Sequence, residues 1–96
     1  MTTVPTAIVT GGAQGIGKAT ARRLLEKGMN VAIADVDEEA GRETVLEYEG
    51  FGNIRFISCD VSDDAQVRRL IDDAVGEFRG IDALVNNAGI SGFKPL

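Results

Sequence analysis

The sequence predicts an α/β fold: a partial parallel sheet with strand order 3-2-1-4 and helices on both faces. Three observations predict it. Short apolar runs alternate with helical patterns along the 96 residues, which is typical of βαβ units. A glycine-rich turn, from Gly11 to Gly17, follows the first apolar run, and the second apolar run ends in Asp35. Right-handed crossovers would place the first two helices on one face of the sheet and the third on the other.

Composition indicates an ordinary folded protein, either one small domain or part of a larger one. Hydrophobic residues make up 44% of the chain and charged residues 26%. The net charge of −5 argues against a nucleic-acid surface, and the pairs Arg22-Arg23 and Arg68-Arg69 are expected on solvated helix faces. No apolar run is long enough to span a bilayer. We therefore predict no nucleic-acid partner and no membrane partner.

The first βα unit is predicted from Pro5 to Gly28. Pro5 marks the start of a strand over about residues 6–10, where a missing N–H costs least. A helix is expected from about Gly15 to Lys27, with Gly28 as its left-handed cap. Its inner face is predicted to contain Ile16, Ala19 or Thr20, Ala21, Leu24 and Leu25.

The glycine turn is the predicted anion site. Glycine permits positive φ angles and close approach of a ligand to the backbone. The helix that begins near Gln14 or Gly15 presents N–H groups without intrahelical partners, together with the positive end of the helix dipole. A dinucleotide diphosphate fits such a place. The alternative is a glycine turn with a purely structural use.

The second strand, Asn30 to Asp35, is almost uniformly apolar, as expected for a strand covered on both faces. Asp35 follows Gly17 by 18 residues, close to the roughly 20-residue interval at which a carboxylate meets the adenosine ribose. A carboxylate can accept hydrogen bonds from both ribose hydroxyls but would repel the 2′-phosphate of NADP. NAD is therefore the predicted cofactor. The alternative for Asp35 is a solvated strand end or a helix cap.

The second helix is expected to open at Asp37 or Glu38 and to lie half exposed, ending at Gly50 and Gly52. A third strand should follow over residues 53–59. Cys59, the single cysteine, is predicted to be a buried structural thiol, since the chain has no histidine to activate it. One cysteine and no signal sequence favour a reducing, cytoplasmic location.

The third helix carries the clearest apolar stripe. Asp63 and Gln66 fit a capping box at its start, while Asp60 is open to either a capping or a binding role. Gly80 should close the helix, before a fourth strand over residues 81–85 and the tetrapeptide 86–89, Asn-Asn-Ala-Gly. The residues expected in the core are Val67, Leu70, Ile71, Ala74, Val75 and Phe78.

Four motifs in register resemble those of the short-chain dehydrogenases/reductases, a family of nicotinamide-dependent oxidoreductases on a Rossmann sheet. They are TGxxxGxG at Thr10 to Gly17, Asp35, the pair Asp60-Val61, and the tetrapeptide 86–89. The resemblance implies that Asp60 and Val61 contact the adenine ring and that Asn86 is structural. It also implies that Ala13 stands where relatives that use NADP often have a basic residue.

The combined prediction contains no catalytic residue and no metal ligand. The predicted cofactor-binding residues are Gly11, Gln14, Gly15, Ile16, Gly17, Asp35, Asp60, Val61, Asn87, Ala88 and Gly89.

The resemblance further implies that residues 1–96 form a truncated dinucleotide-binding half-domain. The family's catalytic serine and Tyr-x-x-x-Lys pair would lie beyond Leu96, and Tyr48 cannot replace them because Gly52 stands four positions later. The fourth strand would then be a bare edge, so we expect association with the missing portion or a homo-oligomer.

Three functional hypotheses follow. The first is the NAD-binding portion of an oxidoreductase that acts on an alcohol or carbonyl substrate. The alternatives are a non-catalytic nucleotide-binding module and a methyltransferase that uses S-adenosylmethionine.

Overall fold

A computed structural model describes residues 4–87. Within that range the strands are β1 (Thr6–Thr10), β2 (Asn30–Asp35), β3 (Ile54–Ser58) and β4 (Ala83–Asn86). The helices are α1 (Gly15–Glu26), α2 (Glu38–Tyr48), the short 3-10 helix η1 (Glu49–Phe51) and α3 (Asp64–Phe78). The sheet is parallel with the order β3-β2-β1-β4. This confirms the predicted fold class.

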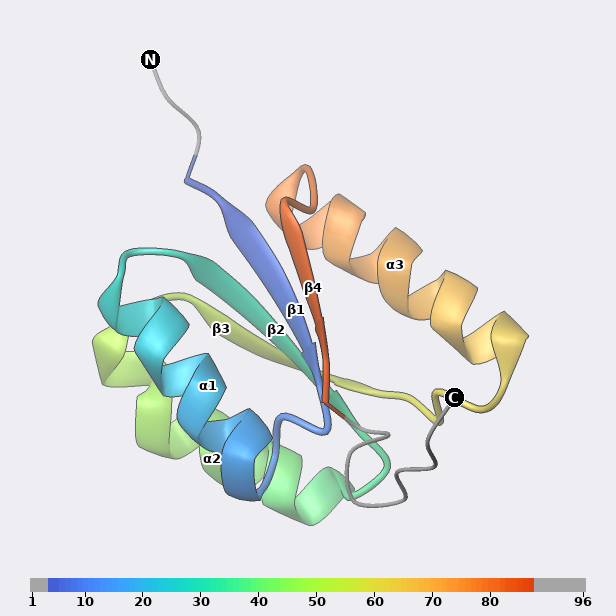
Figure 1. Cartoon of the computed structure of the whole chain (residues 1–96), viewed down its shortest axis with the longest axis horizontal. Coiled ribbons are helices and arrows are strands. Elements are labelled where there is room, and N and C mark those ends of the chain that lie inside the picture. Colours follow the sequence, from blue (N-terminus) through green and yellow to red (C-terminus); the bar gives the residue numbers. More distant parts are fainter. Residues whose placement is uncertain (1–3, 88–96) are drawn as a thin grey trace.

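The helices form a layer on each face of this sheet, with α1 and α2 together on one face and α3 on the other (Figure 1). Alternate residues of β1 serve the two layers, because side chains along a strand point to opposite faces. Val9 packs in the cluster with Ala21 and Leu25 of α1, while Ile8 packs with Leu70 and Ala74 of α3. The predicted division of the helices between the two faces is confirmed.

The strand register brings three carboxyl ends to one edge. Thr10, the last residue of β1, is the partner of Ala34 in β2 and of Asn86 in β4. In open α/β sheets ligands bind outside the carboxyl ends of the strands. The turn that follows Thr10 and the acidic residue that follows Ala34 therefore lie at the edge where a site is expected.

The inner face of α1 differs from the prediction. Its buried residues are Gly17, Ala21 and Leu25, a stripe with a spacing of four. Ile16, predicted to be internal, is 67% exposed. One residue turns a helix by about 100°, so Ile16 lies beside this stripe rather than on it.

The core prediction for α3 is wrong for two residues. Leu70 and Ala74 are buried, but Ile71 and Val75 are 38% and 43% exposed. The core on this face is built with β1 and β2 residues such as Ile8 and Ala32. Leu84 of β4, the register partner of Ile8, is 58% exposed. The helix therefore covers β1 and β2, and part of its apolar stripe remains uncovered.

The helix ends follow the predicted signals with one exception, and β4 spans Ala83–Asn86 instead of the predicted residues 81–85. Gly28 takes the left-handed conformation after α1, with φ 89°. After α3 it is Arg79, with φ 68°, that takes this conformation and not Gly80. Of the residues described, none belongs to a helix with the length and apolarity that a membrane span requires.

Candidate nucleotide-binding site

A cleft of about 650 Å³ opens at the carboxyl ends of β1, β2 and β3. It is lined by every predicted binding residue that the structure describes, except Gly17. Ala88 and Gly89 were also predicted but lie outside the described residues. The cleft is lined by Gly11, Gln14, Gly15, Ile16, Ala34, Asp35, Val36, Cys59, Asp60, Val61 and Asn87.

The glycines of the turn serve two different purposes. Gly11 and Gly15 have φ angles of 65° and 57°, which favour glycine. Gly17 is required by packing: a Cβ there would lie 2.1 Å from the Gly11 carbonyl oxygen and 2.6 Å from Asn87 Nδ2. A Cβ on Gly12 would lie 2.6 Å from Ile33 Cγ2. The lack of a side chain at Gly17 thus lets α1 pack closely against the turn and against Asn87 after β4, although Gly17 does not line the cleft.

The N-terminus of α1 lacks the cap that the other two α-helices have. Asp37 caps α2 by accepting a hydrogen bond from the Ala40 N–H, and Asp63 caps α3 in the same way. Gln14, at the N-cap of α1, makes no such bond, and the first turn of α1 has no acidic residue. The α1 N–H groups and dipole are therefore available to an anion from outside the helix.

Asp35 is half-buried beside this helix end. Its Oδ2 accepts a hydrogen bond from the Ala13 N–H at 3.2 Å, and its Oδ1 accepts one from the Asp37 N–H at 3.1 Å. These contacts orient the carboxylate and tie the end of β2 to the glycine turn. Asp37 is the helix cap, so the capping alternative for Asp35 is wrong.

The Gln14 side chain forms a second tie to the β2–α2 segment. Its Nε2 donates to Asp37 Oδ2 at 2.9 Å, while Oδ1 of the same carboxylate caps α2. Gln14 is exposed and lines the cleft. One carboxylate thus links the start of α1 to the start of α2.

The Asn86-Asn87 pair connects β4 to the glycine turn through Thr10. The Thr10 hydroxyl donates to Asn86 Oδ1 at 3.0 Å and accepts from the Asn87 N–H at 2.9 Å. Asn87 Nδ2 donates to the Gly11 carbonyl at 3.5 Å. Asn86 is structural, as predicted, and Asn87 both braces the turn and lines the cleft.

Asp60 also lines the cleft, in the turn between β3 and α3. Its Oδ1 accepts hydrogen bonds from the Ser62 hydroxyl at 2.7 Å and the Ser62 N–H at 3.0 Å, which lower the pKa of this carboxyl. The expected capping box is modified. Asp63 accepts from the Gln66 N–H, but Gln66 Oε1 accepts from the Asp60 N–H. Asp60 therefore does not cap α3.

Cys59 lines the cleft, a position that the sequence analysis did not predict for it. The side chain is buried, and burial raises the pKa of its thiol. Ala34 and Val36 also line the cleft without having been predicted. Their positions next to Asp35 could have predicted this, because residues beside the last residue of a strand lie at the same carboxyl end of the sheet.

A glycine turn that opens an uncapped helix beside an acidic strand end defines a Rossmann-type nucleotide-binding protein. A family model described as short chain dehydrogenase matches residues 5–96. The chain therefore belongs to the short-chain dehydrogenase family, which confirms the resemblance inferred from its motifs.

Individual relatives agree with this assignment. An uncharacterized oxidoreductase of Thermotoga maritima is 44% identical over 92 residues, which cover 94% of this chain and 36% of that protein. A short chain dehydrogenase/reductase from Burkholderia phymatum, solved in complex with NAD, is 35% identical with a TM-score of 0.81 over 85% of this chain and 30% of that one. An actinorhodin polyketide ketoreductase solved with NADPH is 33% identical, with a TM-score of 0.85 over 88% and 33%.

The chain thus spans about a third of the length of the curated relatives that it matches. It corresponds to the nucleotide-binding portion of a short-chain dehydrogenase-like oxidoreductase, and the family supports a nicotinamide cofactor.

Proposed function

We propose that this chain binds NAD in the cleft and is the cofactor-binding portion of an oxidoreductase that transfers hydride between an alcohol or carbonyl substrate and nicotinamide. The observation that carries the proposal is the uncapped N-terminus of α1, which faces the same cleft as the oriented Asp35 carboxylate. The N-terminus of α1 supplies hydrogen-bond donors for a diphosphate, and the Asp35 carboxylate supplies acceptors for a ribose.

Each part of the cofactor has a proposed place. The diphosphate would lie against the turn and first residues of α1, and the adenosine ribose against Asp35. Asp60 and Val61 would contact the adenine ring. Asn87, together with Ala88 and Gly89, would line the path to the nicotinamide, the ring that accepts or donates the hydride. The residues proposed to contact the diphosphate are Gly11, Gln14, Gly15 and Ile16, which line the cleft, whereas Gly17 would act through the close packing of α1.

Charge supports NAD over NADP. No lysine or arginine is found among the described residues that line the cleft. A 2′-phosphate would face the Asp35 carboxylate, whose two oxygens already face the backbone N–H groups of Ala13 and Asp37. Like charge without a compensating cation disfavours binding.

A non-catalytic nucleotide-binding role is the second candidate. The lining of the described cleft offers no tyrosine, lysine or histidine that could transfer a proton. Tyr48 is buried between α1 and α2, where Lys18 Nζ lies 5.6 Å from its ring centre. A serine and a Tyr-x-x-x-Lys pair in sequence beyond Leu96 would favour the enzyme, and their absence there would favour the binding module.

Calorimetry with NAD, NADP and S-adenosylmethionine tests the proposal. NAD should bind at least about ten-fold more tightly than NADP, because one unfavourable charge contact costs on the order of 1.4 kcal/mol or more. Equal affinity for the two dinucleotides would contradict the role of Asp35. Binding of S-adenosylmethionine in place of NAD would contradict the function itself.

We also propose that the chain is a truncated half-domain and that it is cytoplasmic. We propose further that it forms a homo-oligomer or associates with the missing portion. The exposed apolar residues Ile71, Val75 and Leu84 support association. A compact monomer in size-exclusion chromatography would contradict it.

A further inference from the structure

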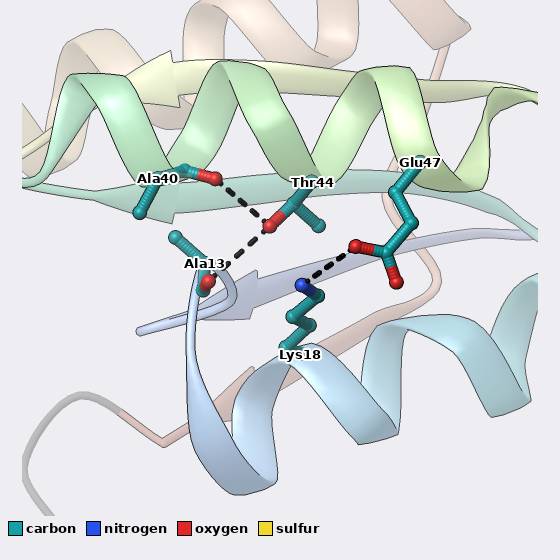
Figure 2. Close-up of polar contacts among 5 residues, drawn as sticks. All are labelled: Ala13, Lys18, Ala40, Thr44 and Glu47. Carbon is teal, nitrogen blue, oxygen red and sulfur yellow. Dashed lines mark hydrogen bonds and ion pairs between the residues drawn. The ribbon is translucent and has the colours of Figure 1, made fainter.

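Thr44 of α2 reaches the glycine turn from outside the cleft. Its side chain is fully buried, and its hydroxyl lies 3.2 Å from the Ala13 carbonyl oxygen and 2.9 Å from the Ala40 carbonyl oxygen (Figure 2). A hydroxyl has a single proton, so these two carbonyls share one donor.

The two carbonyls differ in whether they accept a second hydrogen bond from another donor. Ala40 is the residue four positions before Thr44 within α2, so its carbonyl already accepts the backbone hydrogen bond of the helix. Ala13 is buried, and among the described residues Thr44 supplies the hydrogen bond to its carbonyl. Without this hydroxyl the Ala13 carbonyl would be a buried acceptor without a partner, which proteins avoid.

Anchoring this carbonyl also sets the direction of a donor. In a trans peptide the C=O and the next N–H point in opposite directions. The Ala13 carbonyl faces α2, so the Gln14 N–H points away from α2, and within the described residues it makes no hydrogen bond. Gln14 itself lines the cleft.

We propose that Thr44 is a positioning residue for nucleotide binding, which fixes the peptide between Ala13 and Gln14 so that the Gln14 N–H is preset for the cofactor diphosphate. The inference rests on the proposed NAD-binding function. The Asp35 carboxylate holds the preceding peptide through the Ala13 N–H. Ala13 is thus held on both sides, by β2 and by α2, and the turn is preorganised before a ligand arrives.

The test compares Thr44→Val, which removes the hydroxyl at nearly constant volume, with Thr44→Ser, which keeps it. NAD affinity should fall about three- to ten-fold in Thr44→Val, the range expected for one neutral hydrogen bond. It should return to within about two-fold in Thr44→Ser. In the ligand-free chain, NMR order parameters of residues 13–15 should fall below the rigid value of about 0.85 in Thr44→Val only.

Two control variants separate positioning from general loosening. Thr20→Val removes the same kind of hydroxyl bond, to the Ile16 carbonyl within α1. Lys18→Met breaks the α1–α2 ion pair to Glu47, 2.9 Å long, without touching Ala13 (Figure 2). Both should leave the order parameters of residues 13–15 unchanged.

The outcomes distinguish this inference from the proposed function. If the unaltered chain does not bind NAD, the proposed function fails. If it binds NAD but Thr44→Val binds equally well with an equally rigid turn, the inference alone is overturned. Equal loss of affinity in Thr44→Val and Lys18→Met would also overturn it, because the effect would then come from the helix interface.

Discussion

The Asp35 carboxylate accepts a hydrogen bond from the Ala13 N–H at 3.2 Å across the gap between β2 and the glycine turn. This contact couples the proposed ribose acceptor to the proposed diphosphate loop. The two parts of the site come from different βα units, and this hydrogen bond joins them directly. Substitutions at Asp35 should therefore act through both charge and geometry.

Asp35→Asn should separate these two effects. The amide keeps one oxygen that can accept from the Ala13 N–H, loses the acceptor for the Asp37 N–H, and removes the negative charge. We expect the ratio of NAD to NADP affinity to fall about ten-fold, mainly because NADP binds better. Calorimetry with both dinucleotides measures the ratio. In Asp35→Ala the tie to Ala13 is also lost, so affinity for both should drop. An unchanged ratio in Asp35→Asn would show that this charge does not select the cofactor.

Gly17→Ala should destabilise the fold by about 3 kcal/mol, because the new methyl group would lie 2.1 Å from the Gly11 carbonyl oxygen and 2.6 Å from Asn87 Nδ2. Urea unfolding measures the loss. Gly76→Ala is the matched control in α3, where nothing lies within 4 Å of an added Cβ. It should stabilise the fold by about 0.5–1 kcal/mol through helix propensity. Similar stability of the two variants would contradict the tight contact at Gly17.

Arg79→Gly should stabilise the chain by about 1 kcal/mol. Arg79 ends α3 with φ 68°, a conformation in which a Cβ is unfavourable and glycine is preferred. Thermal unfolding would show a rise in Tm. Arg68→Gly, an exposed position inside α3, should lower stability by about the same amount. A loss of stability in Arg79→Gly would mean that the arginine side chain contributes more than its backbone conformation costs.

The Asp60 carboxyl should titrate below its ordinary value. Hydrogen bonds from the Ser62 hydroxyl and N–H favour the charged form and lower this pKa. The small stabilisation that these bonds give is therefore present above the pKa of the unfolded chain and is lost as the pH falls through the folded pKa. NMR titration of Asp60 measures the shift. Ser62→Ala removes the hydroxyl and should raise the pKa toward the ordinary value, whereas Ser58→Ala should leave it unchanged.

Local signals in the sequence predicted the βα alternation and the glycine turn, and the family resemblance added the strand order and the cleft residues Asp60, Val61 and Asn87. The ribose-binding role of Asp35 was predicted because parallel strands bring their carboxyl ends together, and because its distance from Gly17 can be counted along the sequence. Hydrophobic spacing was less reliable for single residues. It placed Ile16 and Ile71 in the core, whereas both are exposed, because periodicity indicates which face of a helix is apolar but not how much of that face a neighbour covers.

By itself, the sequence determined the βα alternation, the helix breaks and the residue types that meet at the sheet edge, since these depend on neighbours a few positions apart. Only the tertiary structure decided that Thr44 of α2 holds the Ala13 carbonyl and that Gly17 fits beneath Asn87. Such contacts join residues distant in the chain. They depend on how closely two packed elements approach, and no local pattern encodes that distance.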